Sequence, residues 1–185
     1  MSDEIINKVS NSKLINIDLE EFYPDGERVL FDIKDWLFEG IILKEKDFRA
    51  SVKDHNWSGY KNACVALTCS EDAIIPSWAY LLLASELSAF AKKVVVGNLE
   101  LLETVLFQEV IQNLNIEPFK DKPIIIKGCA QKPIPSSAFT MLIQKLQPIA
   151  KTIIYVKLVL QCPYIKEKNK NFIFLSFFYF LNWLL

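Results

Sequence analysis

Residues 64–97, CVALTCSEDAIIPSWAYLLLASELSAFAKKVVVG, decide the fold. An apolar run of strand type at 64–68 is followed by a helical segment at 76–90, where proline is tolerated in the first turn. A second apolar run at 93–96 then stops at Gly97. This order of strand, helix and strand is typical of a parallel βαβ unit.

The same pattern continues toward the C-terminus. Asn98 can cap a helix reaching Leu114, with Leu102 and Leu106 on its apolar face and Glu103 on its polar face. Strand starts recur about every 30 residues, the length of one βαβ unit. We therefore predict an α/β fold: a small, mostly parallel four-stranded sheet with helices on both faces. The later elements are a strand at 124–126, a helix at 136–149 and a strand at 152–155.

Residues 1–61 are less regular and are interpreted as an irregular N-terminal α+β segment. LINIDL at 14–19 suggests a strand, and FDIKDWLFEG and KEKDFRASVKDHNW suggest two short helices. No Gly, Ser or Pro linker separates this segment from the rest. We expect one α/β domain over 1–155, in which 1–61 caps the βα repeats of 62–155 or forms a dimer surface.

Composition excludes several classes of function. The net charge of −1, from 21 basic and 22 acidic residues, shows no basic excess for a nucleic-acid groove. His55 is the single histidine, which excludes sites built from two or more histidines. The N-terminus lacks a basic start followed by an apolar run. We expect a cytoplasmic protein whose thiols are reduced.

Candidate site residues follow the predicted strands, because ligands of open parallel sheets bind beyond the carboxyl ends of the strands. Cys69 and Cys129 are candidate thiolate ligands for an iron–sulfur cluster or zinc, with His55, a carboxylate or a partner protein completing the set. They are also candidate catalytic thiols, with Cys129 as nucleophile. A third alternative is that they are inert. The candidate cofactor-binding residues beside them are Ser70, Asp72, Lys127 and Gly128.

The C-terminal end has an unusual composition. From 166 to 185, every residue except Glu167, Ser176 and Trp183 can be encoded with A and T alone. Restoring one base before Val156 in a back-translation yields GEACSTVPIYKRKE and a stop. We therefore interpret 156–185 as a frameshifted, non-native tail after Tyr155. Its apolar run is short for a membrane span, so we expect no membrane association unless this tail is genuine.

Several long blocks resemble a known family. FYPDGERVLFDIKDWLFEGIILKEKDFR, CSEDAIIPSWAYLLLA, IIIKGCAQKPIPSSAF and LQPIAKTIIY are similar to the bacterial domain of unknown function numbered 2480. Members end in a segment like GEACSTVPIYK, which carries a third cysteine. Their genes tend to lie beside the sulfur-mobilisation system for iron–sulfur assembly. The resemblance implies an accessory factor for iron–sulfur assembly or sulfur handling, with protein partners there. The alternatives are a non-catalytic interaction module and a thiol-dependent enzyme.

Overall fold

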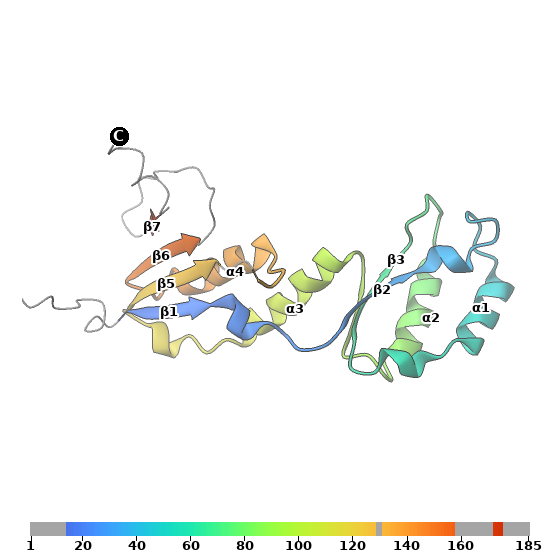
Figure 1. Ribbon diagram of the computed structural model, residues 1–185, viewed down its shortest axis with the longest axis horizontal. Coiled ribbons are helices and arrows are strands. Elements are labelled where there is room, and N and C mark those ends of the chain that lie inside the picture. Colours follow the sequence, from blue (N-terminus) through green and yellow to red (C-terminus); the bar gives the residue numbers. More distant parts are fainter. Residues whose placement is uncertain (1–13, 129–130, 158–171, 176–185) are drawn as a thin grey trace, which may run out of the picture. The chain divides into compact units, whose positions relative to one another are not determined.

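The computed structural model describes residues 14–128, 131–157 and 172–175. It contains parallel strands in two separate sheets, with strand orders β2-β3-β4 and β1-β5-β6-β7 (Figure 1). The chain divides accordingly into two compact units. Unit 2 comprises Pro24–Phe107, and unit 1 comprises the chain before and after it.

Unit 2 is a three-stranded parallel sheet covered on both faces. Strands β2 (Arg28–Asp32) and β4 (Lys93–Val96) flank the central strand β3 (Cys64–Thr68). Val65 and Leu67 of β3 belong to the core formed with helices α1 (Glu45–Asp54) and α2 (Ser77–Leu87). Cys64 and Ala66 point to the opposite face, where helix α3 (Leu99–Asn113) covers them with Leu102 and Leu106. Alternate side chains of β3 therefore pack against helices on opposite faces of the sheet.

Unit 1 is built around β5 (Pro123–Gly128). It pairs in parallel with β1 (Ile15–Asp18) on one side and β6 (Thr152–Lys157) on the other, and Figure 1 shows these three strands side by side. Ile124 and Ile126 of β5 are fully buried, as are Ala138, Leu142 and Leu146 of helix α4 (Ser136–Leu146). A short strand, β7 (Phe172–Leu175), pairs with β6.

These sheets confirm the α/β class and correct the predicted arrangement. The four predicted strands exist, but two belong to each sheet, so a single four-stranded sheet is wrong. The N-terminal segment supplies β1 to one sheet and β2 to the other. Helix α3 connects the two sheets, since it follows β4 of one sheet and precedes β5 of the other. The unit boundaries lie at Tyr23/Pro24 and Phe107/Gln108, positions that the sequence pattern did not indicate.

The first strands of the two units are copies of one local structure. β1 leads into the 3₁₀ helix η1 (Leu19–Phe22), and β2 leads into η2 (Ile33–Trp36). Asp18 and Asp32 end their strands and cap these helices by accepting hydrogen bonds from the backbone N–H two residues later, at 3.0 and 3.1 Å. The next residue, Leu19 or Ile33, is buried in each copy.

The remaining strands and helix repeat as well. β3-α2-β4 and β5-α4-β6 align without a gap, and the strand registers agree: Val65 faces Val94 as Ile124 faces Ile153. Prolines occupy the N-cap of α2 and of α4. The chain thus contains two copies of one unit, with unit 2 inserted between the first strand of unit 1 and the rest. The identical pairs are Ile75/Ile134, Pro76/Pro135, Ser77/Ser136, Ala79/Ala138, Leu83/Leu142, Leu87/Leu146, Ala91/Ala150 and Lys92/Lys151.

Backbone geometry before the central strand supports this equivalence. Asn62 and Asp121 occupy matching positions and have positive φ angles of 62° and 56°. Their amide N–H groups donate to Phe90 O and Ile149 O, both at 2.9 Å. Asn and Asp tolerate the left-handed region better than other non-glycine residues, which suits them to this turn. Within the described residues, no helix has the length and apolar content needed to cross a membrane.

Candidate functional site

Cys69 lies directly after β3, at the carboxyl end of the unit 2 sheet. Its side chain is half-buried against the core of this unit, and its Sγ–H donates to Glu71 O at 3.6 Å. Cys64, the other cysteine in the described part of the chain, is fully buried, and burial raises the pKa of its thiol. The two thiols therefore differ in access: only Cys69 is open to a reagent or partner.

The loop after Cys69 is held by Asp32 from the neighbouring strand. Asp32 Oδ1 accepts from the Ser70 N–H at 3.1 Å as well as from the Lys34 N–H, and Lys34 Nζ lies 3.7 Å from Oδ2. Burial alone would raise the pKa of Asp32, but hydrogen bonds from Ser70 and Lys34 outweigh it and hold the pKa below its usual value. Asp32 thus fixes Ser70 in place, while Asp72 is exposed.

Tyr80 of α2 borders Cys69. Burial, and then a negative charge on Cys69, raise the pKa of the Tyr80 phenol. The phenol therefore stays protonated at neutral pH and can donate a hydrogen bond. The predicted residues of this unit, Cys69, Ser70 and Asp72, do lie on one short segment, and Tyr80 is a neighbour that spacing alone did not indicate.

The other predicted site residues belong to the other sheet. Lys127 and Gly128 are the last residues of β5 in unit 1. Cys129 follows them and lies outside the described residues, so its predicted role is not tested. The expectation that one sheet edge gathers Cys69 with Lys127 and Gly128 is wrong, because β3 and β5 belong to different sheets.

Gly128 has a tight environment of its own. A β-carbon at this position would collide with the hydroxyl of Tyr155, which lies over it from β6. The ring of Tyr155 packs edge-on against Phe139 of α4, with centroids 5.6 Å apart. The close approach of the Tyr155 ring therefore accounts for a glycine at position 128, where there is no room for a side chain.

His55 lies at the C-cap of α1 inside an aromatic cluster. Its ring centroid is 4.5 Å from that of Trp57 and 5.4 Å from that of Trp36, and Nε2 lies 3.1 Å from the Tyr60 hydroxyl. Burial lowers the pKa of His55, which favours the neutral ring. The ring contacts and the hydrogen bond support a packing role for His55.

Metal binding finds no support among the residues that the structure describes. No group of three or more His, Cys, Asp or Glu side chains there is arranged to hold an ion. The predicted ligand set includes Cys129, which lies outside the described residues, so the prediction of a zinc or iron–sulfur site stays a prediction.

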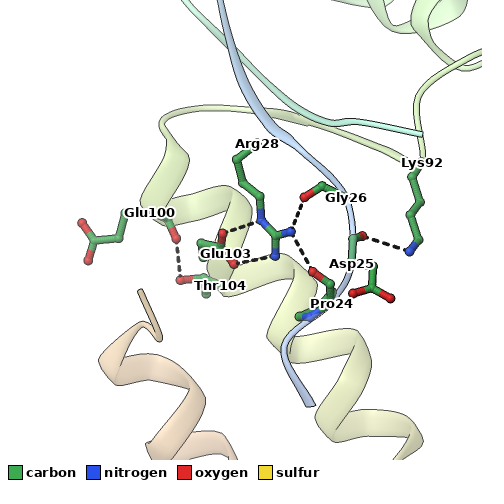
Figure 2. Close-up of polar contacts among 8 residues, drawn as sticks. All are labelled: Pro24, Asp25, Gly26, Arg28, Lys92, Glu100, Glu103 and Thr104. Atoms are coloured by element: carbon green, nitrogen blue, oxygen red, sulfur yellow. Dashed lines mark hydrogen bonds and ion pairs between the residues drawn. The ribbon is translucent and has the colours of Figure 1, made fainter. Parts of the chain in front are cut away.

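A buried ion pair is the polar feature that the sequence pattern missed. Glu103 of α3, expected on a solvated face, is only 5 % exposed. Figure 2 shows the Arg28 guanidinium bound to both its carboxylate oxygens, with Nε to Oε1 at 2.7 Å and Nη2 to Oε2 at 3.3 Å. Arg28 Nη1 also donates to Pro24 O and Gly26 O, at 2.7 and 2.5 Å. This network ties the start of unit 2 to α3.

Fold and site together define a parallel α/β protein of two repeated units, with an accessible thiol at a strand end of one unit. Residues 3–167 match the family model described as a protein of unknown function, DUF2480, and the chain belongs to this family. No curated protein and no solved structure matches the chain.

Proposed function

We propose that this chain is a cytoplasmic accessory protein for iron–sulfur cluster assembly or sulfur handling, and that Cys69 is its working thiol. The observation that carries the proposal is the contrast between the half-buried Cys69, at the carboxyl end of β3, and the fully buried Cys64 at the start of the same strand. Strand carboxyl ends are where open parallel sheets present reactive groups. Protein partners of the assembly machinery supply the substrate.

The chemistry we assign is sulfur transfer. The Cys69 thiolate attacks the outer sulfur of a protein persulfide donor. A new S–S bond forms on Cys69, the donor S–S bond breaks, and the donor leaves as a thiolate. The Asp32–Ser70 hydrogen bond holds the loop during this exchange.

Reaction with iodoacetamide and with sodium polysulfide tests this proposal. We expect rapid modification of Cys69 and slow modification of Cys64, mapped by mass spectrometry of the full chain. C69S should lose the persulfide adduct that forms at position 69. C64S, the matched control, should retain this adduct on Cys69. Equal rates at both cysteines would contradict the proposal.

A second candidate function is a non-catalytic interaction module. Several large apolar side chains of unit 2 are exposed, and apolar surface of this kind often marks protein contacts. If this alternative holds, C69S retains partner binding and the exposed apolar residues are required for it. These residues are Phe38, Ile41, Ile42, Ile74 and Leu81, with exposed fractions of 42 % to 93 %.

We also propose that residues 156–185 are a non-native tail produced by a frameshift after Tyr155. Neither the family match, which extends to residue 167, nor the pairing of β7 with β6 supports the frameshift. Sequencing the source DNA across the Tyr155 codon tests it, and an intact frame would refute it. Iron, zinc and sulfide contents of the given and frame-restored chains, purified without oxygen, would show whether a restored cysteine creates a cluster site.

A further inference from the structure

The equivalent strands β4 and β6 differ in what lies along their outer edges. Among the described residues, β4 has one neighbouring strand, β3, whereas β6 has β5 on one side and β7 on the other. Strand β7 runs parallel to β6 and places Phe172 opposite Ile153. Two residues later, Phe174 lies opposite Tyr155. Unit 2 therefore repeats a strand that pairs with a further strand in unit 1, without a described strand beside it.

The outer edge of β4 presents backbone groups that can pair with another strand. On the inner side, the Gly97 N–H donates to Leu67 O of β3 at 2.8 Å. Successive residues of a strand direct their N–H and C=O groups to opposite sides, so those of Val94 and Val96 point away from β3. These two valines occupy the same register positions as the two β6 residues that face the phenylalanines of β7.

The exposure of the two edge strands differs in the same sense. Ile153 of β6, which lies beside β7, is 2 % exposed, whereas its counterpart Val94 is partly exposed. Val96, at the carboxyl end of β4, is 50 % exposed. Edge strands are commonly protected by a proline, a bulge or an inward-pointing charge, and the Val-Val-Val run of β4 contains none of these. This edge is therefore suited to accept a strand.

The side chains of β4 indicate what the incoming strand carries. Val94 packs against the core beneath α2, and Val95 packs on the opposite face, which α3 covers. The β7 residues at the three positions equivalent to those facing the valines are Phe, Ile and Phe. Aromatic and aliphatic side chains pair well with β-branched residues across strands. Lys93 stands where β6 has Thr152, and its positive charge favours an acidic residue just before the first aromatic one.

We propose that the outer edge of β4 binds an extended segment of a partner protein as a parallel fourth strand. The segment carries an acidic residue opposite Lys93, followed by aromatic, aliphatic and aromatic residues opposite the three valines. The occupant is argued from β7, which pairs in this direction and register with the equivalent strand. Strand addition obtains affinity from backbone hydrogen bonds and specificity from alternate side chains. The proposal does not depend on sulfur transfer by Cys69.

The experiment titrates the full chain, labelled with ¹⁵N-valine, with the acetylated and amidated peptide EEFIFLEE. We expect saturable shifts of the Val94 and Val96 amide signals and none for Val52 of α1. An N-methyl group on the peptide isoleucine, whose N–H faces β4 in this register, should weaken binding by about tenfold or more. The matched control carries the methyl group on the second phenylalanine, whose N–H points away, and should bind as the parent peptide does. Equal effects of the two methyl groups, saturable shifts confined to Val156 of β6, or no saturable shift would overturn the proposal.

Two further comparisons test the edge and its charge. V96P removes an outward N–H, a change that edge strands tolerate, so it should fold by circular dichroism and lose peptide binding. Undiminished binding by folded V96P would refute the proposal. The peptide KKFIFLKK should bind less tightly than EEFIFLEE, and equal or tighter binding would contradict the acidic flank. Sedimentation checks the occupant: a wild-type dimer that becomes a monomer in V96P would assign the edge to a second copy, against the proposal.

Discussion

Replacing Glu103 with glutamine should strongly destabilise unit 2. The Glu103 side chain is 7 % exposed and that of Arg28 is 15 % exposed, so E103Q leaves a guanidinium charge in a largely buried position. Breaking a buried pair by removing one partner costs about 3–5 kcal/mol. We expect the lower end, about 3 kcal/mol, because Arg28 keeps its hydrogen bonds to Pro24 O and Gly26 O.

That cost corresponds to a large thermal shift. A unit of this size loses roughly 4–8 °C in Tm for each kcal/mol, so E103Q should lower the Tm of unit 2 by roughly 12–24 °C. The double variant R28M/E103L should lose less than E103Q, because it removes both charges and retains apolar volume.

Tryptophan fluorescence during urea unfolding measures this effect. Trp57 is 7 % exposed and its indole N–H donates to Val52 O, so its emission reports on the core of unit 2. A W183F background removes the tryptophan that lies outside the described residues. E45A is the matched control, since the Arg49–Glu45 pair is more than half exposed and should leave the urea midpoint unchanged. A midpoint for E103Q equal to that of E45A would refute the reasoning.

Three further predictions concern the repeats and the titrating groups. L83A and L142A, at matching fully buried positions, should each cost about 2–5 kcal/mol in urea unfolding; a neutral result for either would deny that its helix packs as described, and L81S at 70 % exposure is the control. Burial lowers the folded-state pKa of His55, so the unfolded chain binds the proton first, and stability should fall as pH drops below about 6.5. H55N should flatten that slope, and an unchanged slope would assign it to another group. The pKa of Asp32 is also lowered in the folded state, so its contribution is present above its usual value of 3.8 and is lost as pH falls through the lower folded-state pKa. D32A should cost about 1 kcal/mol through loss of the η2 cap and should speed Cys69 alkylation, whereas a rate equal to wild type would show that Ser70 does not depend on Asp32.

Local elements were predictable because their causes are local. The Asn98 cap is confirmed, since its Oδ1 accepts from the Leu101 N–H at 2.8 Å. Helices α2 and α4 begin after Pro76 and Pro135 and bury the same small and leucine positions. The strand LINIDL and helix α1 also formed where the pattern indicated them.

Glu103 and Val96 show where local reasoning ends. Periodicity assigns Glu103 to solvent, yet Arg28, from a strand far away in the sequence, makes its burial tolerable by neutralising it. Val96 of β4 is 50 % exposed, and the repeat places Tyr155 of β6 at the equivalent position of unit 1. Neither the partner of Glu103 nor the equivalence of Val96 with Tyr155 can be read from spacing within one element.

The sequence by itself determined the parallel α/β class, the helices with their buried faces, and the strand end that carries Cys69. Periodicity, caps and apolar runs act over a few residues, and they are written directly in the chain. Only the tertiary structure decided that the strands form two sheets and that β1 and β2 belong to different ones. It also decided that Lys127 and Gly128 end a strand of one sheet, whereas Cys69 follows a strand of the other. The physical reason is that runs of Val and Ile pair equally well with many partners, so pairing is set by side-chain packing between segments far apart in sequence.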